Sequence, residues 1–180
     1  MPEEREPADL LAVLGTAEDG EYKNEWFGFG VLFEDSLLVT PLDEWDAEGL
    51  ASAFSLGEAV NAFTAKSEDG ASELKISVSE AGAAVTEAEF AGIMKALVPS
   101  ALSERGLEAV KSKAEKLGFA GEEHCALRCE AVLVTESGEK VSVCQLSVFV
   151  KSGRFIASVT ATAYIEDSTD SILGGFYALA

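Results

Sequence analysis

The stretch EEHCALRCEAVLVTESGEKVSVCQLSVFVKSGRFIASVTATA, residues 122–163, contains three runs in which apolar side chains recur at every second position. This alternation is typical of β-strands with one buried face. Ser-Gly pairs at 137–138 and 152–153 separate the runs and favour tight turns. The stretch therefore predicts a three-stranded antiparallel meander.

The positions of the two turns predict how the strands pair. A two-residue loop at 137–138 places Cys129 opposite Leu146, and a loop at 152–153 places Phe155 on the face of Val150. The same pairing puts all three cysteines on one apolar face: Cys125, Cys129 and Cys144. His124 points to the opposite face, because neighbouring strand residues alternate.

One histidine and three cysteines are the right atoms for a tetrahedral metal site, but the predicted strands separate them. Cys125 and Cys129 lie four residues apart on one strand, or about 13 Å, whereas two thiolates on one zinc lie within about 4 Å. Cys129 and Cys144 are diagonal neighbours, with about 7 Å between β-carbons against the roughly 4 Å of a disulfide. We expect buried free cysteines, with no metal and no cofactor.

Further strands are predicted upstream. Phe27, Phe29, Val31 and Phe33 alternate along residues 27–33, where the glycines favour close approach of a helix or an aromatic ring. Residues 36–42 form the next strand. Residues 59–65 and 72–79 form a hairpin around Asp69-Gly70. Four strands in succession imply an antiparallel sheet.

The period changes to that of a helix after Thr86. Thr86 and Glu89 have the spacing of a capping box. The predicted buried face consists of Phe90, Ile93, Met94 and Leu97. Pro99 is expected to end or kink this helix. Residues 107–117 fit either a helix or a strand. A short terminal helix is capped by Asp167 or Ser168, with Ile172, Leu173 and Phe176 facing inward.

The length of 180 residues, with 48% hydrophobic and 25% charged residues, is typical of one domain. Residues 1–20 are expected to form an acidic tail or a short helix ending at Gly15, and residues 21–180 the domain. The net charge of −19 argues against nucleic-acid partners, which attract basic clusters. The sequence contains no run of 18 apolar residues, so we expect no membrane insertion.

The odd number of cysteines indicates reduced thiols, and the acidic amino terminus is unlike a secretory signal. Both features predict a cytoplasmic location for the chain as written. If a signal has been removed, the location is extracytoplasmic or envelope-associated instead.

Motifs for catalysis are missing from the sequence: it has no nucleophile elbow, phosphate loop, H-E-x-x-H or paired C-x-x-C. An enzyme would have to use His124, the single histidine, with a carboxylate. Glu122 and Glu123 precede it, but this segment is more simply an exposed charged turn. We predict no catalytic residues.

Several segments together resemble the PsbP-like family, which includes a photosystem II extrinsic protein and the Ran-binding Mog protein, and in particular its uncharacterised bacterial branch. These segments are YKNEWFGFGV (22–31), PLDEW (41–45), TEAEF (86–90), LGFAGEEHCALRCEA (117–131), VCQLSVFVKSGRFIASVTATA (143–163) and DSILGGF (170–176). The resemblance implies an α+β fold, a three-layer α/β/α sandwich around an antiparallel sheet, and favours a strand at 107–117. Characterised relatives act as docking proteins, and no partner or catalytic residue carries over to this chain.

We therefore expect a non-enzymatic protein-interaction or accessory module whose protein partner is unknown. Tyr22 and Trp26 are the candidate partner-binding residues, because Trp26 has the opposite strand parity to Phe27 and Phe29 and would be exposed. One alternative is a small apolar-ligand carrier with a pocket between the sheet and the helix face of Phe90, Ile93 and Leu97. Another is an enzyme that uses His124 with a carboxylate.

Overall fold

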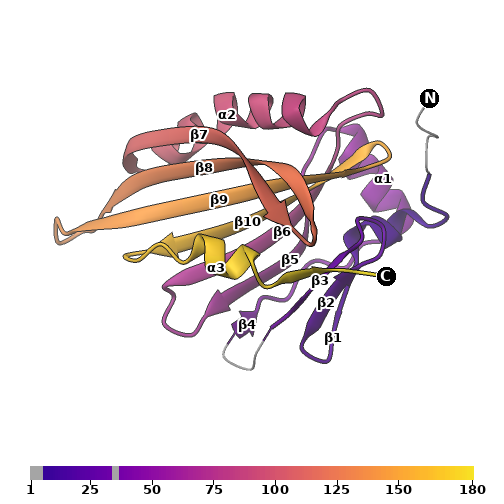
Figure 1. The fold of residues 1–180 in the computed structure, drawn as a ribbon, viewed down its shortest axis with the longest axis horizontal. Helices are drawn as coiled ribbons and strands as arrows, with labels where there is room; N and C mark the ends of the chain where they lie inside the picture. The colour runs from indigo at the N-terminus through magenta and orange to yellow at the C-terminus, as the bar shows by residue number, and fades with distance from the viewer. Residues whose placement is uncertain (1–5, 34–36) are drawn as a thin grey trace.

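The computed structural model describes residues 6–33 and 37–180 and has an α+β fold built on two antiparallel sheets (Figure 1). The larger sheet has the order β4-β5-β6-β10-β9-β8-β7. Its strands are β4 (Leu37–Val39), β5 (Val60–Ser67), β6 (Ser72–Glu80), β7 (Leu107–Phe119), β8 (Glu122–Val134), β9 (Lys140–Ser152) and β10 (Phe155–Tyr164). The smaller sheet has the order β1-β2-β3-β11, with β1 (Thr16–Glu18), β2 (Glu21–Asn24), β3 (Phe29–Leu32) and β11 (Phe176–Ala178).

The larger sheet is the middle of three layers. Helix α2 (Glu87–Glu104) packs on β7, β8 and β9 and covers a core that includes Leu127, Phe149 and Ile156. The small sheet lies on the opposite face with α1 (Ala47–Ser55), α3 (Thr169–Leu173) and the 3₁₀ helix η1 (Leu10–Leu14). Figure 1 shows α1 and the small sheet together at one end, away from α2. The predicted α+β sandwich around an antiparallel sheet is confirmed.

The pairing of β8 with β9 differs from the prediction by one residue. Cys129 pairs with Gln145, and Glu130 pairs with Cys144. The loop spans 135–139 instead of two residues, because Thr135 closes it through hydrogen bonds with Gly138 and Glu139. A shift of one residue turns the side chains to the other face. The prediction that all three cysteines share a face is therefore wrong: Cys144 lies opposite Cys125 and Cys129.

The pairing of β9 with β10 differs from the prediction by two residues, which preserves the faces. Phe155 pairs with Ser152 and Ala157 with Val150. Phe155, Ala157, Val159 and Ala161 of β10 therefore share a face with Val150, Val148 and Leu146, as predicted, and all of these side chains belong to the main core.

Residues 21–33 form two strands, not the single run that the alternation suggested. The chain turns at Gly28, which has φ 78° and donates its N–H to the Asn24 carbonyl. Strands β2 and β3 then pair within the small sheet, while β4, β5 and β6 join the large one. The glycine prediction is confirmed at Gly30, where an added Cβ would lie 2.6 Å from the Tyr177 hydroxyl.

Several other elements follow the sequence predictions. The capping box of Thr86 and Glu89 begins α2, the hairpin around Asp69-Gly70 forms β5 and β6, and 107–117 is part of strand β7.

Pro99 does not end α2, which continues to Glu104. Helix α1, with Asp46 as its N-cap, was not predicted. In the terminal segment, Leu173 and Phe176 are buried, and the Asp167 side chain accepts a hydrogen bond from the Thr169 N–H.

The predicted short helix before Gly15 is present as η1, but it is docked into the core instead of forming a tail. Val13 is fully buried, and the Leu14 carbonyl accepts a hydrogen bond from the Tyr22 hydroxyl. Strand β1 then pairs with β2. The first five residues of the predicted tail and Ser36 of the predicted strand lie outside the described residues. Within the described residues, no helix is long and apolar enough to cross a membrane.

Candidate functional site

Tyr22 and Trp26 do not form an exposed patch. Tyr22 is 0% exposed and Trp26 is 8% exposed. Trp26 packs edge-on against Phe155, and its indole N–H donates to the Ser152 carbonyl at 3.3 Å. The parity argument assumed one continuous strand, whereas Trp26 lies in the turn between β2 and β3. Tyr22 and Trp26 are therefore not exposed, although their prediction as partner-binding residues depended on exposure.

The three cysteines are free and lie in different surroundings. Cys125 and Cys129 are buried beneath α2, whereas Cys144 is half-buried on the other face. Burial raises the pKa of the Cys129 thiol, and burial followed by the nearby Asp167 and Glu130 carboxylates raises that of Cys144. Both remain protonated thiols at neutral pH. Across residues 6–33 and 37–180, no group of three His, Cys, Asp or Glu side chains is placed to hold a metal ion.

His124 is buried and paired with a carboxylate from α2. It is 9% exposed, and its Nδ1 lies 2.9 Å from Oε1 of Glu87. The same carboxylate accepts the backbone N–H of Lys151 at 3.1 Å and that of Cys125 at 3.4 Å. Glu87 thereby joins the first turn of α2 to strands β8 and β9. The prediction that this segment is merely an exposed turn is wrong for His124 itself.

The pKa of Glu87 lies below its ordinary value of 4.5. Partial burial raises this pKa, but the hydrogen bonds from His124, Lys151 and Cys125, together with the charge of His124, lower it by more. Because the folded-state pKa is depressed, the carboxylate contributes stability above the unfolded pKa, and this contribution is lost as the pH falls through the folded value.

Replacing Glu87 by alanine is expected to lower the free energy of unfolding at pH 7 by about 2 kcal/mol, because hydrogen bonds to a charged, partly buried group are removed. The loss should shrink as the pH falls from 4.5, the ordinary pKa of the carboxyl, through its lowered folded-state pKa, because protonation of the wild-type carboxylate removes the same contribution. Denaturant unfolding at pH 7 and at pH 3.5 measures both effects. The matched control is Glu48→Ala in the exposed first turn of α1, which should cost under about 0.5 kcal/mol. A Glu87→Ala loss that is the same at both pH values would contradict the role of the carboxylate.

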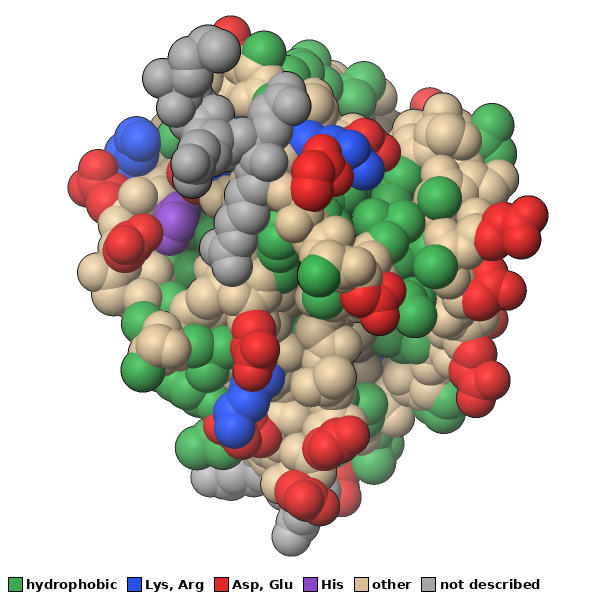
Figure 2. All heavy atoms as spheres, turned by 90° about the vertical axis from the view of Figure 1, so that its right-hand side faces the viewer, with side chains coloured by type: hydrophobic (Ala, Val, Ile, Leu, Met, Phe, Trp, Pro, Cys, Tyr) green, Lys and Arg blue, Asp and Glu red, His purple; other side chains and the backbone are tan. Residues whose placement is uncertain are grey.

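A cavity of about 410 Å³ opens beside His124. Its apolar wall includes Phe27, Phe29 and Phe119, and its rim includes Glu122 and Ala178. Phe119 stands edge-on to the His124 ring, with 6.2 Å between ring centroids. On the face drawn in Figure 2, a histidine side chain reaches the surface beside acidic side chains. The volume lies within the range of small-molecule pockets.

Lys151 lines this cavity, but its ammonium group is already bound. The Nζ atom donates to the carbonyl oxygens of Ala83 at 2.6 Å, Gly82 at 3.4 Å and Val85. Lys151 therefore holds the segment that leads into α2, and its charge is directed at the backbone instead of the cavity.

The outer face of α2 is apolar, contrary to the prediction. Ile93 is 51% exposed and Leu97 is 59% exposed, whereas the buried positions are Ala91 and Leu102. Phe90 does face the sheet, with its ring 5.3 Å from that of Phe149. The prediction of Ile93 and Leu97 as core residues is therefore wrong. Between Phe90 and Ser103 the helix has one charged residue, Lys95, and apolar residues on two sides, so periodicity cannot choose between them.

The pocket expected beneath Phe90, Ile93 and Leu97 cannot be lined by all three side chains, because Ile93 and Leu97 are exposed on the outer side of α2. A cavity of about 240 Å³ lies at the carboxyl end of α2, among Leu102, Leu107 and Cys129. The sequence does not identify Glu87 as a partner of His124. The capping box involves Glu89, and no motif relates residue 87 to residue 124, which lies 37 residues away.

No family model and no curated protein sequence matches the chain. Among solved structures, cyanobacterial PsbP (CyanoP) from Synechocystis is similar over 91% of this chain and 96% of its own, with a TM-score of 0.60 and 12% identity. LpqN of Mycobacterium tuberculosis, which is involved in cell envelope biogenesis, is similar over 84% of this chain and 83% of its own, with a TM-score of 0.40 and 13% identity. PA94 of Pseudomonas aeruginosa, a putative regulator, reaches a TM-score of 0.31 at 16% identity, over 74% of this chain and 76% of its own. The match to CyanoP extends over nearly the whole of both chains, and the protein therefore has the PsbP-like fold.

Proposed function

We propose that the protein is a non-enzymatic interaction module that docks a helix of another protein on the outer face of α2. The observation that carries the proposal is the exposure of Ile93 and Leu97 on a helix with one charged residue, Lys95, between Phe90 and Ser103. Contiguous exposed apolar surface on an otherwise highly charged molecule is typical of protein-binding sites. The docking role implied by the family resemblance supports the same proposal.

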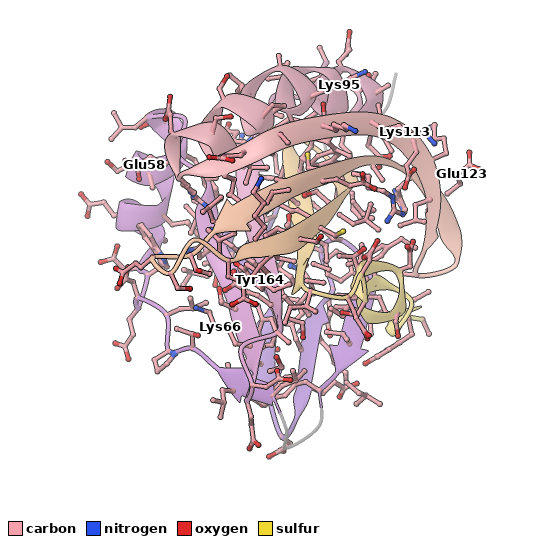
Figure 3. All side chains as sticks on the ribbon, turned by 90° about the vertical axis from the view of Figure 1, so that its left-hand side faces the viewer. Glu58, Lys66, Lys95, Lys113, Glu123 and Tyr164 are labelled. Carbon is pink, nitrogen blue, oxygen red and sulfur yellow. The ribbon has the colours of Figure 1, made fainter. Side chains whose placement is uncertain are left out.

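The shape of this face suits a helical partner. Ala88, Gly92, Ala96 and Ser100 recur at intervals of four residues, and all are exposed. Ile93 and Leu97 form the adjacent row. Such rows are the ridges and grooves into which a second helix packs, and small side chains let its backbone come close. Lys95 projects from α2 at the margin of the molecule in Figure 3.

Charge favours another protein over a second copy of this chain. Each copy carries a net charge of −19, so two copies repel each other. A neutral or basic amphipathic helix meets no such repulsion. The partner we propose is therefore a protein that presents a helix with an apolar face and no excess of acidic residues.

Changing Ile93 and Leu97 to lysine should leave stability almost unchanged. Lysine has a high helix propensity and both positions are exposed, so the free energy of unfolding of the double variant should change by less than about 0.5 kcal/mol. Denaturant unfolding measures this directly. A loss of 2 kcal/mol or more, as expected for core positions, would show that the face is covered in the native protein.

Partner binding tests the function itself. Immobilised wild-type protein and the Ile93→Lys/Leu97→Lys variant are compared for capture of proteins from the source organism, quantified by mass spectrometry. A specific partner should fall by about tenfold or more with the variant, because truncated or charged interface anchors typically cost over 1 kcal/mol. Leu56→Lys, at an exposed leucine at the end of α1, is the matched control and should retain the partner. Equal capture by all three proteins would contradict the proposal, as would a dimer in light scattering that the variant abolishes.

A small apolar-ligand carrier is the second candidate. A cavity of about 540 Å³ lies where β3, β6 and α3 meet, with Val31, Phe33, Leu74 and Ile172 in its wall. A ligand bound there would raise the melting temperature by mass action. A library of apolar compounds that leaves the melting temperature unchanged would remove this candidate.

Enzymatic use of His124 has weaker support. The structure does place a carboxylate beside the imidazole, as that alternative required. The Cys125 thiol, although adjacent in sequence, lies in the core beneath α2 and away from the imidazole. Within the described parts of the chain, the imidazole is hydrogen-bonded to Glu87 and to no hydroxyl or thiol. The pair is therefore better explained as an anchor for α2 and a wall of the adjoining cavity.

A further inference from the structure

We propose that the cavity beside His124 binds a primary ammonium group carried on a small apolar stem. Its lining includes His124, Glu122 and three phenylalanine side chains, those of Phe27, Phe29 and Phe119. It is separate from the outer face of α2, so the proposal does not depend on the interaction with a protein partner.

The hydrogen bond to Glu87 determines which imidazole nitrogen is left for a ligand. A carboxylate accepts hydrogen bonds, and the pKa of Glu87 is lowered, so the proton of this contact belongs to Nδ1 of His124. In the neutral ring Nε2 then carries a lone pair and acts as an acceptor. His124 lines the cavity, and a hydrogen-bond donor is the group that its free nitrogen recognises.

The charges around the cavity favour a cation. Glu122 lies two residues before His124 on the same face of β8, and it lines the rim of the cavity. Lys151 is the one basic side chain of the described lining, and its ammonium is held by the carbonyl oxygens of Gly82, Ala83 and Val85. An anionic ligand would therefore meet the Glu122 carboxylate with no available counter-charge.

The aromatic wall suits the stem of such a ligand. Phe29 and Phe119 meet edge to face, with ring centroids 5.4 Å apart, and Phe27 stacks beside Phe29 at 6.2 Å. Phenylalanine rings attract ammonium groups through their faces and also bury apolar carbon. A cavity of about 410 Å³ accommodates a molecule of phenethylamine size.

The single histidine makes the test direct, because tag-free protein gives one set of imidazole signals in an NMR spectrum. Phenethylamine, phenethyl alcohol and phenylacetate, which share a stem and differ in the polar group, are titrated at pH 7.5. We expect phenethylamine to shift the His124 signal and to bind about tenfold more tightly than the alcohol, with phenylacetate weaker still. The same spectrum should show the tautomer with the proton on Nδ1. Preference for phenylacetate, equal binding of amine and alcohol, or a proton on Nε2 of the neutral ring would each overturn the proposal.

Variants locate the site. Glu122→Gln should weaken phenethylamine binding by about threefold to tenfold, whereas Glu123→Gln, which removes the same charge from the opposite face of β8, should leave it unchanged. Figure 3 shows Glu123 at the periphery of the molecule. Ala178→Phe at the exposed rim should block the cavity without disturbing the His124–Glu87 contact. Amine binding that survives Ala178→Phe unchanged would place the site elsewhere and contradict the inference.

An ammonium on an apolar stem could belong to a free amine or to a lysine side chain. Nα-acetyl-lysine methylamide presents the second form and is titrated in parallel. Tighter binding of phenethylamine assigns the site to free amines, and tighter binding of the blocked lysine assigns it to lysine side chains. Binding of either supports ammonium recognition, and binding of neither overturns it. The Ile93→Lys/Leu97→Lys variant should bind amines normally, which separates this site from the docking face of α2.

Discussion

Replacing Asn24 by alanine is expected to lower the free energy of unfolding by about 3–4 kcal/mol, the largest effect predicted for a polar side chain in this protein. Asn24 is 0% exposed. Its Nδ2 donates to the Val13 carbonyl at 2.9 Å and to the Tyr22 hydroxyl at 3.1 Å, and its Oδ1 accepts the Phe27 N–H at 3.1 Å. Alanine would remove these partners from the Val13 carbonyl and the Phe27 N–H, and would leave the Tyr22 hydroxyl only its bond to the Leu14 carbonyl. Denaturant unfolding at pH 7 measures the loss.

Two further variants at asparagine positions make this prediction specific. Asn61→Ala, at an exposed position of β5, should change stability by less than about 0.5 kcal/mol. Asn24→Asp keeps the acceptor for Phe27 but places a buried carboxylate against the Val13 carbonyl. It should therefore be at least as destabilising at pH 7 and recover partly as acid neutralises it. An Asn24→Ala protein within 1 kcal/mol of wild type would show that η1 is not held by this side chain.

Replacing Arg128 by methionine is expected to cost about 2–3 kcal/mol at pH 7. The guanidinium binds both carboxylate oxygens of Asp170, at 2.9 and 3.1 Å, and lies 2.8 Å from Oε1 of Glu115 and 3.6 Å from Asp167. It therefore ties α3 to β7 and β8. Loss of a buried pair costs about 3–5 kcal/mol, and the partial exposure of Arg128 and Asp170 reduces this value.

The pH dependence of this loss identifies its source. Burial raises the pKa of Asp167, but the hydrogen bonds from Thr169 and the charge of Arg128 lower it by more, so the net direction is downward. The Asp167 carboxylate therefore contributes to stability above pH 3.8, its ordinary pKa, and this contribution is lost as the pH falls through its lowered folded-state pKa. The difference between wild type and Arg128→Met should therefore narrow below pH 3.8. Arg105→Met, at the exposed end of α2, is the matched control and should cost under about 0.5 kcal/mol. Equal stability of wild type and Arg128→Met at pH 7 would contradict this account.

Part of the candidate site could not be predicted from the sequence. His124 was singled out because it is the only histidine, and a carboxylate partner was the stated requirement for any use of it. The partner in the structure, Glu87, is 37 residues away and comes from a helix. The nearer candidates, Glu122 and Glu123, do not make this contact. Sequence spacing cannot identify such a pair, because it depends on how α2 is placed on the sheet.

The exposed surface shows a second limit. Tyr22 and Trp26 were expected outside and are buried, while Ile93 and Leu97 were expected inside and are exposed. Both predictions relied on local periodicity. The first failed because the strand is interrupted by a turn, and the second because α2 has apolar side chains on both sides.

The amino-acid sequence alone determined the local features: the strand runs of the meander, the capping box of Thr86 and Glu89, the hairpin at Asp69-Gly70 and the α+β class. These depend on contacts within a few residues. Only the tertiary structure decided the phase between β8 and β9, the division into two sheets, the rotation of α2 and the contact of Glu87 with His124. Alternation reports parity within one strand, but the pairing of two strands depends on the backbone of the loop between them. Burial likewise depends on which surfaces pack together, and a one-residue shift was enough to move Cys144 to the opposite face of the sheet.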